Sequence, residues 1–363
     1  MSAIKHPSEI VQTDWINILR SEAARAEQLK QLTPVQVALL HRQRWFTLLT
    51  PKQYGGLEWS LPAVVRFEEA IAWADGSVAW VLTLCTGAGW FGGFLQPALA
   101  QTLFADPAVC FAGSGAQAGT AAITAEGYII NGQWLHASGA PHATVFTANC
   151  TITRNGVPLT GSDGNPVIKP FVLLPGEVEL LPTWKSFGLV ATASNAFKAT
   201  NVTVTRDRCF EINQARAVDP SPLYQYPFLQ LAEATLAANI SGMSLHFTEA
   251  AQQLLQQTQK PGTMAIAGPL LQQAQHTIQT LRTAFYKALD ESWQQQLQGS
   301  ITAAALQAVS ETSRKLAQES RRTADELYPY CGLQAAATDT EINRIWRDLH
   351  TASQHGLLIY PRG

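Results

Sequence analysis

The chain has 363 residues and a mass of 39.4 kDa, which gives room for two or three domains. Hydrophobic residues make up 46%, so a wholly disordered chain is excluded, and 25 basic against 27 acidic residues exclude a general polyanion-binding protein. We therefore expect no nucleic-acid partner. Charged residues reach only 14%, below the roughly 25% of an ordinary soluble domain, so another copy of the chain is expected to cover part of the surface.

The cysteines and the N-terminus indicate the compartment. Five widely spaced cysteines without a C-x-x-C pair form neither a disulfide framework nor a zinc site. The N-terminus lacks the apolar stretch of a signal peptide, so we expect reduced thiols in the cytoplasm. The stretch 76–105 contains no charge, but glycines and Pro97 interrupt it, which favours a buried helix over a membrane span.

The first hundred residues have the pattern of helices. Thr33-Pro34-Val35-Gln36 is a capping box with proline at the first helical position. A second helix is predicted from Ser60-Leu61-Pro62 to a break at Asp75-Gly76, and Ser77 begins a very apolar one. This part is predicted to be an N-terminal helical domain, 1–107.

From about Pro107 the pattern changes to β-rich runs between turn dipeptides. Asn131-Gly132, Asn155-Gly156 and Asp163-Gly164 are strong hairpin signals when they separate such runs. We therefore predict a central antiparallel β domain, 108–212.

After Asp219-Pro220-Ser221-Pro222 the helical period returns and persists. Four segments are rich in alanine, glutamine and leucine: Pro227–Thr258, Pro269–Gln298, Thr302–Leu327 and Asp339–Leu358. They predict a C-terminal four-helix bundle, 213–363. The predicted fold class is α+β, in the order helices, sheet, bundle.

Several short motifs follow one another over residues 20–358. They are Leu49-Thr50-Pro51-Lys52-Gln53-Tyr54-Gly55-Gly56, Ala74-Asp75-Gly76-Ser77-Val78-Ala79-Trp80, Gly127–Trp134 with Ala137-Ser138-Gly139, Trp184 with Gly188 and Thr192-Ala193-Ser194, and Arg347-Asp348-Leu349-His350-Thr351-Ala352 with Gln354-His355. In this order they resemble the motifs of acyl-CoA dehydrogenase-like flavoproteins. Within that family the chain is most similar to the flavin-dependent monooxygenases of the p-hydroxyphenylacetate hydroxylase type.

The resemblance implies a fold and an activity. The implied enzyme binds FMN or FAD between the β domain and the bundle, receives reduced flavin from a separate reductase, oxygenates a small organic substrate and assembles as a homotetramer. A dry pocket is the physical requirement for this chemistry, and the chain is apolar enough to build one. We expect no metal.

Ser138 is the strongest candidate among the site residues. A small hydroxyl beside Gly139 suits a flat ring packed on a sheet and can hydrogen-bond a flavin nitrogen. The alternative is a turn serine that bonds its own backbone. The resemblance also implies flavin contacts for Trp134, Gly139, Thr192 and Ser194.

Ser114, in Gly113-Ser114-Gly115, matches a serine beside the substrate, and its alternative is an ordinary glycine-rich turn. His350 and His355 lie five residues apart, roughly 140° around a helix at about 100° per residue, so both cannot line one pocket. The resemblance places His355 at the flavin, where a neutral imidazole can move a proton. The alternative for either histidine is packing in the bundle. Asp348 is expected to pair with Arg347 or Arg344.

Three departures keep other functions open. No glutamate follows Glu341, where acyl-CoA dehydrogenases usually place their base, although Glu233 matches the position that a minority of them use. Ala88-Gly89 replaces a histidine of the hydroxylases, and Val190 replaces a common arginine. The alternatives are therefore an acyl-CoA dehydrogenase with Glu233 as base, or a flavin-less, non-catalytic relative.

Overall fold

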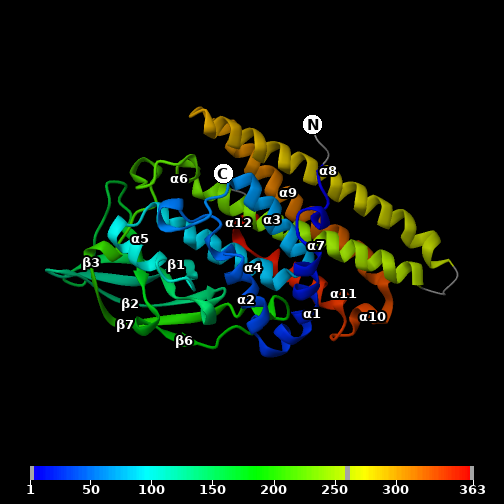
Figure 1. Ribbon diagram of the computed structural model, residues 1–363, viewed down its shortest axis with the longest axis horizontal. Helices are drawn as coiled ribbons and strands as arrows, with labels where there is room; N and C mark the ends of the chain where they lie inside the picture. Colours follow the sequence, from blue (N-terminus) through cyan, green and yellow to red (C-terminus); the bar gives the residue numbers. More distant parts are fainter. Residues whose placement is uncertain (1–3, 258–261, 360–363) are drawn as a thin grey trace.

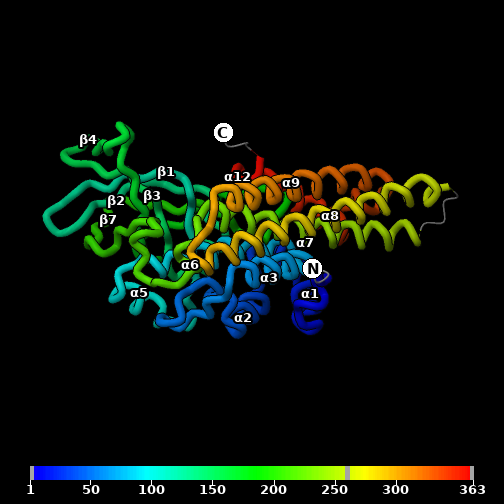
Figure 2. Tube along the Cα trace, turned by 90° about the horizontal axis from the view of Figure 1, so that it is seen from above, coloured from blue at the N-terminus to red at the C-terminus, as the bar shows by residue number. Residues whose placement is uncertain are grey.

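A computed structural model describes residues 4–257 and 262–359. A β-sheet domain lies at one end of the long axis (Figure 1). The three longest helices extend toward the other end, and the N-terminal helices lie along one side (Figure 2). These long helices are α7 (Phe228–Gln257), α8 (Thr263–Leu297) and α9 (Ala303–Leu327). The order of helices, sheet and bundle is the predicted one.

The N-terminal helices begin and end close to the predicted positions. They are α1 (Thr13–Leu29), α2 (Pro34–Arg42), α3 (Leu61–Ala74), α4 (Gly76–Gly89) and α5 (Pro97–Phe104). The predicted capping box is confirmed, because Thr33 Oγ1 accepts from the amide of Gln36 at 3.2 Å and Gln36 Oε1 accepts from the amide of Thr33 at 2.9 Å. Asp75 ends α3 and accepts from the amide of Val78 at 2.8 Å, which caps α4.

Helix α4 is almost entirely buried, as the charge-free sequence predicts. Its apolar side chains meet α3, α7 and the sheet. Among the helices in the described ranges, none combines the length and the apolar character that a membrane crossing needs.

The sheet has the order β4-β3-β1-β2-β7-β6, and β5 pairs with β3. Its strands are β1 (Phe111–Ile123), β2 (Gly127–Ala137), β3 (Val145–Arg154), β4 (Val157–Pro158), β5 (Ile168–Leu173), β6 (Glu179–Leu181) and β7 (Asn195–Thr205). All pairs are antiparallel except β1 with β3, which run parallel because β2 returns the chain between them. The predicted antiparallel domain therefore contains one parallel pair.

One of the predicted hairpin turns is confirmed and another is wrong. Asn155 and Gly156 join β3 to β4 with φ of 52° and 79°, as a two-residue hairpin requires. Asn131-Gly132 instead lies within β2. A Cβ at Gly132 would lie 2.6 Å from Gly119 Cα and 2.8 Å from the indole of Trp134. This glycine therefore allows close packing rather than a turn.

The sheet divides beyond the Gly119–Gly132 pair. The first residues of β1 pair only with β3, and the last residues of β2 pair only with β7. The indole of Trp134 lies at this division, donates from Nε1 to the carbonyl of Asn149 on β3 at 3.0 Å, and stacks on Phe197 with ring centroids 5.0 Å apart. Trp134 is fully buried and joins the two halves of the sheet core.

Helix α7 is the centre of the helical part, and α3, α8, α9 and α11 (Glu341–Ala352) pack against it. The bundle core is therefore shared with the N-terminal domain. Helix α11 has only 12 residues and is followed by the short α12 (Gly356–Ile359), so the fourth bundle helix is shorter than predicted. The short helices α6 (Pro222–Gln225) and α10 (Gly332–Ala336) connect longer elements.

The predicted start of α8 at Pro269 is wrong, because the helix already begins at Thr263. A proline inside a helix leaves the carbonyl four residues earlier without its amide partner. Pro269 and Ala265 are both exposed, so water can replace that bond. Thr258, the predicted end of the preceding helix, lies outside the described residues.

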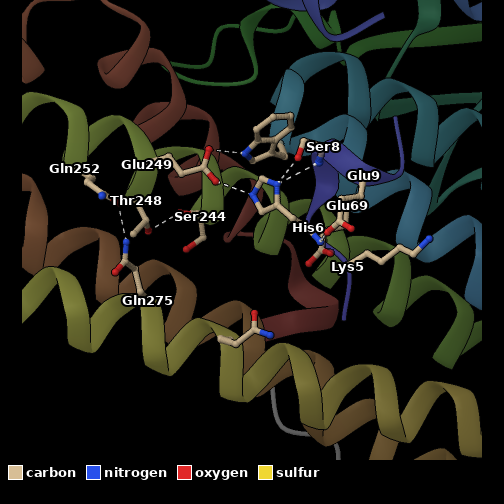
Figure 3. Close-up of polar contacts among 12 residues, drawn as sticks. Lys5, His6, Ser8, Glu9, Glu69, Ser244, Thr248, Glu249, Gln252 and Gln275 are labelled. Atoms are coloured by element: carbon tan, nitrogen blue, oxygen red, sulfur yellow. Dashed lines mark hydrogen bonds and ion pairs between the residues drawn. The ribbon is translucent and has the colours of Figure 1, made fainter. Parts of the chain in front are cut away.

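The segment ahead of α1 packs across α3 and α7 (Figure 3). His6 Nε2 lies 2.8 Å from Glu249 Oε1, and Trp73 Nε1 donates to Glu249 Oε2 at 2.8 Å. Arg282 on α8 donates to the carbonyl of Lys5 at 3.1 Å. The N-terminal segment thereby connects three helices.

Candidate active site

Three of the predicted site residues meet at the end of β2 that faces α4. Ser138 Oγ lies 2.8 Å from Ser194 Oγ, and Ser194 Oγ lies 2.7 Å from Thr192 Oγ1. The three side chains are nearly buried, and together they form what we call the hydroxyl cluster. Gly139 donates its amide to the carbonyl of Thr192 at 2.8 Å, which joins the end of β2 to the segment before β7.

The proton of each hydroxyl in the cluster has a determined direction. Thr192 donates to the carbonyl of Leu189 at 2.8 Å, because a carbonyl oxygen can only accept. Ser194 must then donate to Thr192, and Ser138 must donate to Ser194. Ser138 Oγ keeps free lone pairs but no free proton, so a group that binds to it must be a hydrogen-bond donor.

Leu189 determines this direction, and it lies in the segment 184–195, which we call the 184–195 loop. Its carbonyl accepts from Thr192 Oγ1, from Trp184 Nε1 at 2.9 Å and from the amide of Thr192 at 3.2 Å, so its lone pairs are occupied. Leu189 and Ala193 have φ of 50° and 45°, a conformation that is costly for residues with side chains. Surrounding contacts must therefore hold the loop in place.

Helix α4 connects the hydroxyl cluster with the C-terminal segment. Cys85 Sγ lies 3.7 Å from the carbonyl of Ser138, and a Cβ at Gly139 would lie 2.8 Å from that sulfur. The close approach of Gly139 is therefore to α4. Five residues earlier on α4, and so on another face of the helix, the indole of Trp80 meets the ring of His355 edge to face, with centroids 6.0 Å apart.

His355 lies in the turn between α11 and α12, and the prediction that it lies on the last long helix is wrong. Burial lowers the pKa of His355, so the imidazole is neutral near pH 7. Nδ1 accepts from the amide of Leu357 at 3.4 Å, which leaves the proton on Nε2 as a donor. His350 faces away, with Nε2 2.7 Å from Asp325, so the two histidines do lie on different sides.

Three predicted site residues lie apart from the hydroxyl cluster, namely Ser114, Trp134 and His355. Ser114 lies on β1 just before the register shift, and its Oγ accepts from the amide of Ala116 at 3.3 Å. Trp134 lies in the sheet core, with its indole nitrogen already bonded to Asn149. Among the contacts of residues 4–257 and 262–359, none joins His355 directly to the hydroxyl cluster.

Glu233, the alternative dehydrogenase base, is fully buried between α7 and α9. Its carboxylate accepts from Arg314 at 2.8 Å and from Ser310. An ion-paired carboxylate enclosed between two helices cannot reach a substrate carbon. The arrangement does not support the dehydrogenase mechanism.

Asp348 was expected to pair with an arginine, but its Oδ1 accepts from the amide of Leu189 at 2.5 Å. Trp80 and Cys85 contact the site from α4, and neither was predicted. Trp80 ends the motif Ala74–Trp80, which had no predicted role at the site, and the apolar, charge-free character of α4 was the signal for Cys85. Sequence alone gives no sign that Leu189 is the carbonyl that orients the hydroxyl cluster.

Comparisons with known proteins show which families and structures this chain resembles. The profile described as "Acyl-CoA dehydrogenase, C-terminal domain" matches residues 231–359. The chain is 28% identical to the oxygenase subunit HsaA of a flavin-dependent monooxygenase from Mycobacterium tuberculosis, over 93% of this chain and 88% of the relative. It is 24% identical to indole-3-acetate monooxygenase from Acinetobacter baumannii, over 86% and 80% of the two chains.

The fold agrees with these matches. The structure of XiaF from Streptomyces sp., in complex with FADH2 and glycerol, superposes with a TM-score of 0.86 at 19% identity, over 97% of this chain and 92% of that chain. The predicted resemblance is confirmed at the level of the superfamily and of its branch. Along most of its length the chain is therefore similar to flavin-dependent monooxygenases with the acyl-CoA dehydrogenase-like fold.

Proposed function

We propose that the protein is the oxygenase component of a two-component monooxygenase, which takes up reduced FMN or FAD from a separate flavin reductase and oxygenates a small aromatic substrate. The relatives named above are an oxygenase subunit and an indole-3-acetate monooxygenase, which supports both the separate reductase and the aromatic substrate. Five free thiols support a cytoplasmic location.

The direction of protons in the hydroxyl cluster carries this proposal. The ring of a reduced flavin presents N–H donors, whereas the corresponding nitrogen of the oxidised ring is an acceptor. Ser138 Oγ offers lone pairs and no proton, so the cluster fits the reduced ring. Pairing with the nitrogen that becomes an acceptor on oxidation would require Thr192 to give up its bond to the Leu189 carbonyl.

The remaining residues have roles that their surroundings allow. Bound reduced flavin supplies the electrons that activate oxygen. The neutral His355, with its proton on Nε2, can donate to or accept from a reacting oxygen near pH 7. The uncharged helix α4 excludes water from one side of the site. Ser114 on β1 would contact the substrate.

Assembly as a homotetramer is part of the proposal. Several large apolar side chains beyond residue 223 are exposed in the single chain, and Leu333 on α10 reaches 89% exposure. Apolar surfaces of this kind mark protein–protein contacts. Light scattering is expected to show a tetramer at micromolar concentration, and a stable monomer would contradict this part.

The test is anaerobic binding of reduced and oxidised FMN and FAD, followed by fluorescence. Wild-type protein is expected to prefer the reduced forms. Ser138→Ala removes the acceptor and should weaken reduced-flavin binding about fivefold, equivalent to about 1 kcal/mol, with little effect on oxidised flavin. Ser300→Ala, at an exposed serine far along the chain, is the control. Absence of binding by either flavin would leave the non-catalytic relative as the better interpretation.

A further inference from the structure

Asp348 links the C-terminal helix α11 to the 184–195 loop. Its side chain is only 4% exposed, and Oδ1 accepts from the amide of Leu189 at 2.5 Å. The carbonyl of the same Leu189 accepts from Thr192 and thereby directs the protons of the hydroxyl cluster. Leu189 therefore connects Asp348, through its amide, to the orientation of Ser138 Oγ, through its carbonyl.

The loop is pressed against α11 at the neighbouring residue. A Cβ at Gly188 would lie 2.0 Å from the carbonyl of Arg347 and 2.6 Å from Thr351 Oγ1, so only glycine allows this approach. Arg347 also donates to the carbonyl of Phe187. The costly φ values of Leu189 and Ala193 persist only because contacts of this kind fix the loop.

Charged groups surround Asp348 on every packed element. Asp75 at the start of α4 and Glu27 on α1 disfavour its ionisation, whereas Arg344 on α11 favours it. His246 from α7, Arg20 from α1 and Glu341 from α11 complete the polar pocket beside Asp75 and Asp348. Burial and the charge of Asp75 raise the pKa of Asp348 to about 7, so the carboxyl titrates near neutral pH.

We propose that Asp348 is a positioning residue, which holds the 184–195 loop in its flavin-binding conformation through the amide of Leu189 and makes flavin affinity depend on its own ionisation. A charged acceptor bonds an amide roughly twice as strongly as a neutral one. Ionised Asp348 therefore holds Leu189 more firmly than protonated Asp348 does. The inference rests on the proposed flavin site.

The test compares reduced-flavin affinity of wild type and Asp348→Asn from pH 6 to pH 8.5. Asparagine keeps a neutral acceptor, so the two proteins are expected to agree at pH 6, with the variant about fivefold weaker at pH 8.5. The ratio of the two affinities at each pH cancels the titration of the flavin and of all other groups. Asp290→Asn, at a half-exposed carboxylate on α8, is the control and should give a ratio near one throughout.

Thermal melts at each pH show whether Asp348→Asn weakens flavin binding by releasing the 184–195 loop or by destabilising the whole fold. A carboxyl whose pKa is raised from 3.8 to about 7 in the folded state makes folding less favourable as pH rises through that range. Asp348→Asn removes the buried charge, so at pH 8.5 it should be at least as stable as wild type while binding flavin more weakly. A ratio that stays constant with pH overturns this inference alone. Failure of wild type to bind flavin at any pH overturns the proposed function.

Discussion

Two buried polar clusters of this protein differ in how completely their hydrogen bonds are satisfied. In the helical part, the carboxylate of Glu69 accepts from Ser241 at 2.5 Å, from Tyr286 at 2.7 Å and from two nitrogens of Arg282 at 2.8 and 2.7 Å. In the site, the hydroxyl cluster uses all its protons but leaves lone pairs free on Ser138. Figure 3 shows Glu69 beside the N-terminal segment.

The difference distinguishes a structural cluster from the cluster that we propose binds flavin. Buried polar groups that bond one another completely fix the packing of the elements that carry them. A buried group with unused capacity of one kind is prepared for a partner of the opposite kind. By this criterion Glu69 holds α3, α7 and α8 together, whereas Ser138 Oγ in the hydroxyl cluster can still accept a hydrogen bond from a ligand.

The largest expected effect comes from the satisfied cluster. Glu69→Ala leaves Arg282, itself only 2% exposed, without a counter-charge, and should lower the free energy of unfolding by about 3–5 kcal/mol. Urea denaturation measures this loss. Asp290→Ala breaks a partly exposed pair with Arg66 and should cost less than about 1 kcal/mol. Glu69→Ala protein that remains folded should bind flavin as wild type does. A loss of flavin affinity would contradict the separation of the two clusters, because it would show that Glu69 also affects the site.

The sequence predicted local signals well and these long-range pairings not at all. The capping box at Thr33 and the break at Asp75 depend on residues within one helical turn, so they are visible in a single sequence. Glu69 and Arg282 are separated by 213 positions, and only the packing of α3 against α8 shows that they form a pair. The hairpin predicted at Asn131-Gly132 was wrong because a glycine that close packing requires looks the same in the sequence as a glycine that a turn requires.

The second-largest expected effect concerns catalysis by His355, which contacts α4 at Trp80, away from the hydroxyl cluster. His355→Ala removes the neutral imidazole and should lower oxygenation of an aromatic substrate about 100-fold, the range of general acid–base catalysis. Glu233→Gln should leave oxygenation nearly unchanged, because Glu233 is paired inside the bundle. Product formed per oxygen consumed, with a flavin reductase supplied, measures both. The reverse pattern, with Glu233→Gln abolishing flavin reduction by an acyl-CoA, would restore the dehydrogenase interpretation.

The third effect is a pH dependence next to the site. His142 donates its amide to the carbonyl of Gly139 at 2.8 Å, and its buried Nε2 has no partner among the described residues. Burial and the nearby His41 lower the pKa of His142 to about 4. The unfolded chain therefore binds more protons between pH 6.5 and 4, and stability falls as pH drops through this range.

The expected loss from His142 is about 2 kcal/mol between pH 7.5 and pH 4.5. His142→Gln cannot gain a proton, so its unfolding free energy should change less over the same interval, as measured by urea denaturation. His276→Gln, at an exposed histidine on α8, should behave as wild type. Equal pH profiles for all three proteins would contradict the lowered pKa of His142.

The site was partly predictable for a physical reason. Ser138, Thr192 and Ser194 are close in space because the ends of β2 and β7 are paired strands, and the family motif preserves both ends. Trp134 belongs to the same motif, yet side chains alternate between the two faces of a strand and its neighbours decide which face is core. Asp348 depends on a helix docking against a loop 159 positions away, which no local pattern reveals.

The smallest expected effect concerns Trp134, and it decides whether this side chain is structural, like Glu69, or belongs to the proposed flavin site. The structure satisfies its indole nitrogen at Asn149 and encloses the ring between Gly119, Gly132 and Phe197. Trp134→Phe keeps an aromatic ring but removes that hydrogen bond, so the free energy of unfolding should fall by about 1–2 kcal/mol from the unpaired carbonyl and the lost volume. Reduced-flavin affinity should stay within twofold of wild type, because the indole bonds Asn149 and stacks on Phe197, both outside the hydroxyl cluster and the 184–195 loop. A fivefold loss of affinity at unchanged stability would instead place Trp134 at the flavin, as the family motif predicts, and would show that a satisfied side chain can still belong to the site.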